Sequence, residues 1–272
     1  MLPIGLQLYS VRNAMEADFE GTLAKVAEMG YEGVEFAGLF GKSAEEIKAI
    51  LEKNGLKAVS THVPLAEMLE DMDKVIATYK AIGCPFIAIP YVDEKYRPGT
   101  PDYPETLKKI DALGAKCKEA GLVLMYHNHD FEFVKIGDKY GIDVMYETVP
   151  ADHLQTELDT CWVNVGGEDP AKFIEKYSGR TPVVHLKDFV MQGREKPKKL
   201  YALIGIDDDE EQAADEAFSF KPVGYGVQDM PAIIAASEKS GAQWLIVEQD
   251  QPDKGNTELS AVKKSIDYLR SL

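Results

Sequence analysis

The alternation of strand-type and helix-type segments constrains the fold of this chain more than any other feature. Eight short runs rich in β-branched and aromatic residues recur along the sequence, and longer runs with helical periodicity separate them. The strand-type segments lie at 4–9, 33–36, 57–62, 86–91, 122–126, 154–159, 182–187 and 244–248. The helix-type segments lie at 19–29, 43–54, 65–82, 104–120, 140–149, 170–178, 230–240 and 258–272. Such alternation predicts parallel strands joined by crossover helices.

The number of units and the chain length favour a closed barrel over an open sheet. The chain has 272 residues, and (β/α)8 barrels typically have about 250. An open sheet that binds a dinucleotide would carry Gly-x-Gly-x-x-Gly after its first strand, and this sequence has no such motif there. The composition does not break anywhere along the chain. We therefore predict the α/β class and a single (β/α)8 TIM barrel domain spanning residues 1–272.

One segment, residues 189–228, interrupts the alternation of strands and helices after the seventh strand. It shows no strong periodic element, and it contains a mixed basic run at 194–199 and an acidic run at 207–211. A loop of this length on a compact barrel is usually a lid or a binding loop. We predict an extended loop or lid here. The acidic run is most simply a solvated surface, and an additional metal site is the alternative.

Composition excludes several kinds of partner. The net charge of -16 repels phosphate backbones, so we expect no nucleic acid partner. No apolar run reaches the ~20 residues that span a bilayer, and the N-terminus lacks the pattern of a signal peptide. Cys84, Cys117 and Cys161 are widely spaced, which is typical of reduced thiols. We therefore expect a cytoplasmic protein without membrane partners.

The most informative motif is Tyr-His-Asn-His-Asp-Phe-Glu-Phe at residues 126–133. It follows the apolar fifth strand, and side chains at i and i+2 of a strand point to the same face, so His127 and His129 are expected to project together. Glu132 lies in the loop beyond and can fold back over the same spot. Imidazole and carboxylate suit Zn, Mn, Fe or Co. A polar strand end with hydrogen-bonded histidines is the alternative.

The carboxyl ends of the other predicted strands extend this constellation. In an α/β barrel these ends form the mouth that carries the active site. Buried carboxylates there are costly unless they are paired or bind a metal. A set of one histidine and three carboxylates suits Mn, Mg or Co, and Zn is also compatible. The polar residues at these ends are Gln7, Tyr9, Glu35, His62, His127, His129, Glu132, Glu157, Asp159, His185, Lys187, Asp188, Glu248 and Asp250.

Short motifs on successive strands resemble those of a known group, the xylose-isomerase-like TIM-barrel superfamily in its sugar phosphate isomerase/epimerase branch. The resemblance covers essentially the whole chain, and the order and placement of the motifs make it specific. The motifs are Gly5-Leu-Gln-Leu-Tyr9, Gly30-Tyr-Glu-Gly-Val-Glu35, Glu157-Leu-Asp-Thr160, Val184-His-Leu-Lys-Asp188 and Val247-Glu248.

The resemblance implies one divalent metal ion held by residues of strands five to eight. Many relatives carry the first ligand, a glutamate, inside strand five, where this chain has Leu124, Met125 and Tyr126. We expect Mn, and Mg, Co, Zn or Fe also fit. The ligands so implied are Glu132, Asp159, His185 and Glu248, with His127 or His129 as substitutes for Glu132.

The resemblance also implies chemistry on a small carbohydrate. Proton abstraction next to the carbonyl of a keto-sugar, and return of the proton elsewhere, would give an isomerase or epimerase. Glu132 and Glu248 would transfer the protons. His127 or His129 could serve as the base instead, since a neutral imidazole, with a pKa near ~6.5, suits proton transfer at neutral pH.

Three further residues are expected to bind substrate, each with an alternative role. Lys187 would contact a substrate oxygen or pair with Asp188 or Glu157. His62 would contact substrate, orient a ligand or be a satisfied strand-end histidine. Tyr9 would form an apolar pocket wall.

Other functions remain as alternatives to an isomerase or epimerase. A lyase or dehydratase would use the same proton abstraction and then lose a β-substituent from an oxidised sugar or keto-glycoside. A DNA-repair endonuclease would need more histidines than the five present and fits the charge poorly. A sugar-binding protein without activity would leave the metal constellation unused. Strands seven and eight show no phosphate-binding glycine loop, so we do not predict a phosphorylated substrate. A homo-oligomer is compatible with the sequence.

Overall fold

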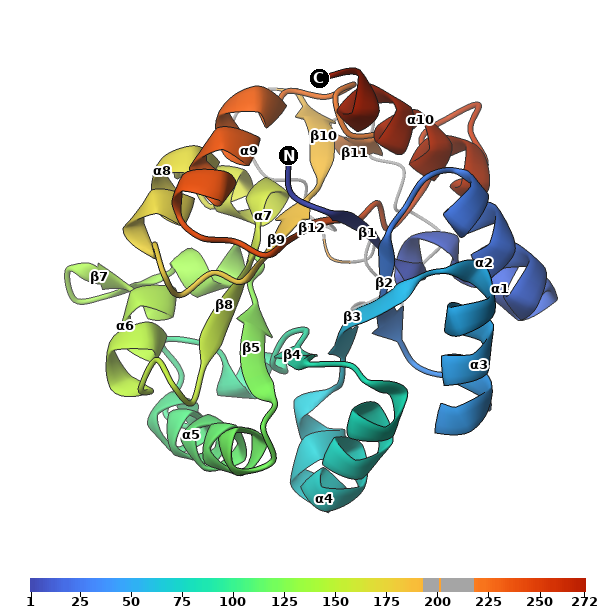
Figure 1. The fold of residues 1–272 in the computed structure, drawn as a ribbon. Coiled ribbons are helices and arrows are strands. Elements are labelled where there is room, and N and C mark those ends of the chain that lie inside the picture. Colours follow the sequence, from blue (N-terminus) through green and yellow to red (C-terminus); the bar gives the residue numbers. More distant parts are fainter. Residues whose placement is uncertain (193–200, 202–217) are drawn as a thin grey trace.

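The computed structural model describes residues 1–192, 201 and 218–272, and within them eight parallel strands close into a barrel (Figure 1). The α/β barrel expected from the sequence is therefore confirmed. Around the barrel the strands follow the order β1-β12-β9-β8-β5-β4-β3-β2. The barrel strands are β1 (Ile4–Gln7), β2 (Gly33–Ala37), β3 (Lys57–His62), β4 (Phe86–Ile89), β5 (Val123–His127), β8 (Gln155–Asp159), β9 (Val183–Leu186) and β12 (Trp244–Val247).

Helices surround the barrel on its outside (Figure 1). The α-helices are α1 (Arg12–Ala17), α2 (Phe19–Glu28), α3 (Ala44–Asn54), α4 (Leu65–Ile82), α5 (Tyr103–Glu119), α6 (Gly141–Thr148), α7 (Thr160–Val165), α8 (Pro170–Lys176), α9 (Met230–Lys239) and α10 (Glu258–Ser271). Short 3-10 helices are η1 (Leu8–Val11), η2 (Glu94–Tyr96) and η3 (Phe131–Phe133). Among the described residues, none of the helices combines the length and the hydropathy that a membrane span requires.

Capping residues explain where several helices begin and end. Ser43 and Glu46 form the capping box expected at the start of α3, each accepting a hydrogen bond from the other's backbone. Helix α4 has the predicted bounds, and it ends at Gly83, whose φ of 87° is the left-handed conformation that glycine adopts without strain. The sequence did not predict α1 and α7. Asp159 caps α7 by accepting a hydrogen bond from the Trp162 amide at 2.9 Å.

The two-residue period of the strands separates a barrel core from a helix-facing core. In β5, Met125 points into the barrel, whereas Leu124 and Tyr126 pack on the helix-facing side. In β9, Val183 points inward and Val184 and Leu186 point outward, and in β12 Ile246 points inward. The apolar plug inside the barrel consists of Val59, Phe86, Ala88, Met125, Val183 and Ile246. Inward-facing residues nearer the carboxyl ends of the same strands therefore lie above an apolar floor.

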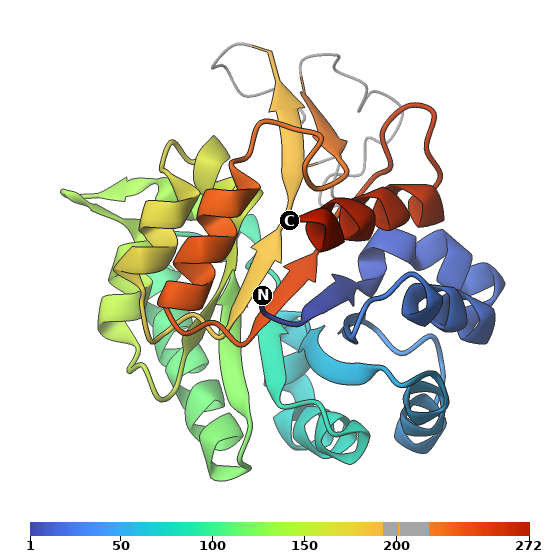
Figure 2. The same ribbon diagram turned by 45° about the horizontal axis from the view of Figure 1, so that its top comes forward.

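Two small ribbons accompany the barrel. Strands β6 (Lys135–Ile136) and β7 (Lys139–Tyr140) form one of them. Strands β10 (Asp188–Met191) and β11 (Phe218–Lys221) form the other, which rises beyond the carboxyl ends of the barrel strands (Figure 2).

The β10–β11 ribbon corrects the prediction that residues 189–228 lack a periodic element. Phe218 and Phe220 alternate with polar residues and pack with Phe189 against Trp162 of α7. The charged runs at 194–199 and 207–211, and with them most of the predicted lid, lie outside the described residues.

Candidate metal centre and pocket

Four side chains from consecutive strands meet inside the barrel and could hold a metal ion. They are His127, Asp159, His185 and Glu248, and one ligand atom of each lies within 4.8 Å of the others. His127 and Asp159 end β5 and β8, His185 lies in β9, and Glu248 directly follows β12. The structure thus brings together three of the four predicted ligands, with His127, the predicted substitute, as the fourth.

The geometry of this group fits a cation. His127 Nε2 lies 3.8 Å from Asp159 Oδ2 and 4.0 Å from Glu248 Oε2, and His185 Nδ1 lies 3.0 Å from the same Glu248 oxygen. Asp159 Oδ2 is buried and has no hydrogen-bond partner among the described residues. A buried carboxylate oxygen without such a partner is costly, and a bound cation would remove that cost. Nitrogen and oxygen donors without sulfur suit the divalent ions expected from the sequence.

The charges around Lys187 also favour a divalent ion. Its Nζ lies 2.5 Å from Asp250, 3.1 Å from Glu248 and 3.7 Å from Asp159. Burial lowers the pKa of Lys187, but the three carboxylates outweigh burial and raise this pKa well above its ordinary value. Three carboxylates face this single ammonium, which is a favourable setting for a bound cation. The predicted alternative of a Lys187–Asp188 pair is not what these contacts show.

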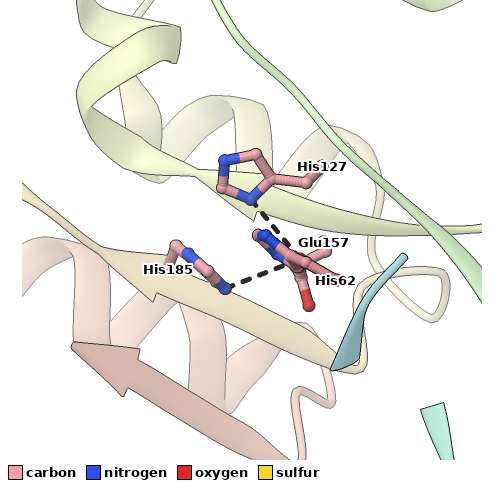
Figure 3. A group of neighbouring side chains, drawn as sticks. All are labelled: His62, His127, Glu157 and His185. Atoms are coloured by element: carbon pink, nitrogen blue, oxygen red, sulfur yellow. Dashed lines mark hydrogen bonds and ion pairs between the residues drawn. The ribbon is translucent and has the colours of Figure 1, made fainter. Parts of the chain in front are cut away.

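A second group lies against the first and shares two of its histidines. Figure 3 shows His62, His127 and His185 converging on Glu157. Glu157 Oε2 lies 2.7 Å from His62 Nε2, 3.4 Å from His127 Nδ1 and 3.5 Å from His185 Nε2. His127 and His185 therefore turn one ring nitrogen to Glu157 and the other toward the first group. Glu157 therefore faces both imidazoles without a hydrogen bond to either, and these four side chains form a second set that could hold a metal ion.

Glu35 is a residue whose role the sequence did not reveal. It is fully buried in β2, accepts hydrogen bonds from Gln7 at 2.6 Å and from Ser60, and lies 2.8 Å from His185 Nε2. Burial raises the pKa of Glu35, but His185 and His62 outweigh it and lower this pKa well below its usual range. Its inward position in the second strand was the signal that could have identified it.

His62 lines the pocket, and two carboxylates contact one edge of its ring. Its Nε2 lies 3.1 Å from Glu35 and 2.7 Å from Glu157, which leaves Nδ1 as the ring nitrogen available to a substrate. Burial lowers the pKa of His62, whereas Glu35 and Glu157 raise it, with a net rise to about 10. His62 is therefore an anchored side chain at the edge of the metal group.

Glu132 does not join the other predicted ligands. Its carboxylate accepts hydrogen bonds from the Tyr126 hydroxyl at 2.5 Å and from the His129 amide at 2.8 Å, and it belongs to neither ligand group. The reason is local: η3 directs Glu132 to Tyr126, which faces the helices rather than the barrel interior. The structure therefore places His127, and not Glu132, beside Asp159, His185 and Glu248.

The burial of Glu132 predicts a pH dependence of stability. Burial raises the pKa of Glu132 to about 8, although Tyr126 and His129 donate to it. A folded-state pKa above the ordinary value means that unfolding releases a proton, so the stability contributed by this group falls as pH rises through about 8. We expect the unfolding free energy of the wild type to fall relative to that of Glu132→Gln between pH 6 and pH 9. Parallel pH profiles of the two proteins in urea denaturation would contradict this expectation.

His129 lies beyond the end of β5, yet its ring remains close to that of His127, with centroids 5.3 Å apart. It stacks on Phe131 at 5.1 Å and packs near Trp162. Burial and the nearby Lys187 lower the pKa of His129 well below its ordinary value. Its buried Nδ1 has no hydrogen-bond partner within the described part of the chain. His129 is thus a neutral imidazole beside the metal group.

A pocket of about 590 Å³ opens onto these groups. His127, His129 and Glu248 line it, and so do His62, Lys187 and Tyr9, the three residues expected to bind substrate. Ligand pockets commonly measure roughly 300–1,000 Å³. The pocket is therefore large enough for a small molecule in contact with the metal group.

Comparison with known proteins agrees with this architecture. Inosose dehydratase of Mesomycoplasma hyopneumoniae strain 7448 is 23% identical over 281 residues, covering 94% of this chain and 89% of that protein. Inosose dehydratase of Lacticaseibacillus casei is 25% identical over 265 residues, covering 89% and 85%. A crystal structure of a sugar phosphate isomerase/epimerase from Parabacteroides distasonis ATCC 8503 superposes with a TM-score of 0.79 at 21% identity, covering 99% of this chain and 94% of that one.

The family model described as xylose isomerase-like TIM barrel matches residues 23–272. That match includes every barrel strand except β1, and with them all four side chains of the metal group. The resemblance recognised from the short motifs is thereby confirmed. The chain belongs to the xylose isomerase-like TIM barrel family.

Proposed function

We propose that this protein is a metal-dependent carbohydrate lyase. It removes the proton next to the carbonyl of a keto-sugar or related carbohydrate, and the substituent on the following carbon then leaves. The observation that carries the proposal is the group of His127, Asp159, His185 and Glu248, of which His127 and Glu248 line a pocket together with His129 and Lys187.

Two groups of residues have different roles in metal binding. His127, Asp159, His185 and Glu248 would hold the ion, with Glu157 facing both imidazoles and Glu35 facing that of His185. A bound divalent ion would act as a Lewis acid on the carbonyl oxygen and make the adjacent proton more acidic.

His129 is the proposed base, because its imidazole lines the pocket and lies beside that of His127 in the metal group, with ring centroids 5.3 Å apart. It takes the proton, and the electron pair of the broken C–H bond forms the new double bond. The C–O bond to the substituent breaks, and the substituent leaves with the electron pair of that C–O bond and takes up a proton from solvent, as water or an alcohol. Lys187 lines the same pocket and would stabilise the oxygen that gains negative charge.

Elimination fits the site better than epimerisation, which was the first expectation from the sequence. The resemblance implied two metal-bound glutamates that pass protons on either side of the substrate. Here Glu132 points away to Tyr126, and His127 takes the strand-five position. The relatives named inosose dehydratase support the same preference, since a dehydratase loses water.

The test uses protein loaded with Mn²⁺, in D₂O, with 2-keto-myo-inositol and with D-fructose as substrates. We expect an unsaturated product from at least one of them, and a loss of about 100-fold or more in rate for His129→Asn with its metal retained. Deuterium at the carbon next to the carbonyl without loss of a group would indicate an isomerase or epimerase. Absence of both exchange and product would contradict the proposal.

A further inference from the structure

The pocket extends well beyond the metal group, and only to one side. From the group it runs over the ends of β2, β3 and β4 to the surface of α4. Figure 1 shows α4 standing outside β3 and β4, next to α3. We call this part of the pocket the annex; Leu39, Pro64, Val75, Pro90 and Tyr91 line it.

The annex differs chemically from the catalytic end of the pocket, which lies at the metal group. All five side chains that define it have apolar surfaces, and the two prolines and Tyr91 offer flat faces. Glu67 and Lys74 of α4 also line the pocket and are exposed, so charge lies where the annex meets solvent. The catalytic end, by contrast, carries histidines, carboxylates and Lys187. A sugar held at the metal group would contact only the polar end of the pocket. An apolar group attached to the sugar would fill the annex.

The loop after β2 holds one wall of the annex in a strained shape. Phe40 has a φ of 52°, which is unfavourable for a bulky residue, and Gly38 and Gly41 flank the turn with φ of 84° and 73°. The Phe40 ring packs on Phe19, with centroids 5.6 Å apart. This contact fixes the loop so that Leu39 faces the pocket. Backbone strain that is kept beside a binding site points to a role for the residue that the loop presents.

We propose that the annex is a subsite for an aromatic substituent, so that a carbohydrate carrying an aryl group binds more tightly than the same sugar without one. Leu39 is a specificity-determining residue of this subsite. The inference rests on the proposed function, because it places the sugar ring at the metal group and the aryl group between Leu39, the two prolines and Tyr91.

The test compares 4-nitrophenyl β-D-glucopyranoside with methyl β-D-glucopyranoside by calorimetric titration of the Mn²⁺-loaded protein. Burial of an aromatic ring in the annex should make the aryl glucoside bind about tenfold more tightly or better. Leu39→Ser should reduce this preference by about fivefold. Leu69→Ser is the matched control, because Leu69 lies on α4 with 46% exposure and does not line the pocket; it should leave the preference unchanged.

The possible outcomes distinguish a failure of the annex from a failure of the proposed function. Equal binding of the two glucosides, no binding of the aryl glucoside, or equal effects of Leu39→Ser and Leu69→Ser would overturn the annex. Metal content is measured on the same samples. A protein that retains its metal but shows no aryl preference overturns the annex alone, whereas a protein that takes up no metal contradicts the proposed function.

Discussion

Lys187→Met is expected to lower the unfolding free energy by about 3–5 kcal/mol, the usual cost of removing one partner of a buried ion pair. Lys187 is 1% exposed, and its ammonium faces the carboxylates of Asp159, Glu248 and Asp250. Methionine fills a similar volume but removes the one ammonium that faces all three carboxylates. The measurement is guanidinium denaturation in the presence of EDTA.

Lys176→Met serves as the control for that measurement. Lys176 pairs with Asp143 at 2.6 Å, but its side chain is 46% exposed, and surface pairs contribute about 0–1 kcal/mol. Added Mn²⁺ should stabilise Lys187→Met, because the ion supplies positive charge to two of the same carboxylates and binds only the folded state. A loss no greater than that of the control would show that Lys187 does not balance the buried charge.

The second large effect is expected on metal affinity. Asp159→Asn should weaken Mn²⁺ binding by about 100-fold or more, because loss of a ligand exceeds the roughly 10–100-fold cost of losing an outer partner. Asparagine still caps a helix, so α7 should keep its N-terminus and the effect is confined to the charge and its oxygen. Calorimetric titration gives the affinity.

Asp152→Asn is the matched control for the metal titration. Asp152 carries the same carboxylate, is 60% exposed, and pairs with Lys118 at the surface. Its removal should leave the Mn²⁺ affinity unchanged. Equal affinities of wild type and Asp159→Asn would exclude Asp159 as a ligand.

Much of the fold could be predicted because local signals and tertiary structure agree. Helix α4 has its predicted bounds, since its apolar period and Gly83 both mark them. The β10–β11 ribbon escaped prediction because its two strands are far apart in the sequence. Phe218 and Phe220 are placed by their packing against Trp162, a contact that no local pattern reveals.

The metal group was predicted in part for a similar reason. Asp159, His185 and Glu248 follow from strand order, because the carboxyl ends of parallel barrel strands meet at one mouth. The place of Glu132 could not be predicted, because one short 3-10 turn decides whether its side chain faces the barrel or Tyr126. The role of Glu35 depends on its register against β1 and β3, which a single sequence does not specify.

The most direct test of the account is the metal content of protein purified without chelator, as wild type, His127→Ala and Glu132→Gln. We expect about one Mn, Co, Zn or Fe per wild-type chain. We expect His127→Ala to lose the metal and Glu132→Gln to keep it, because Glu132 faces Tyr126 and lies outside the ligand group. A wild type that binds no metal even after addition of Mn²⁺, or a Glu132→Gln variant that loses its metal while His127→Ala keeps it, would contradict the account.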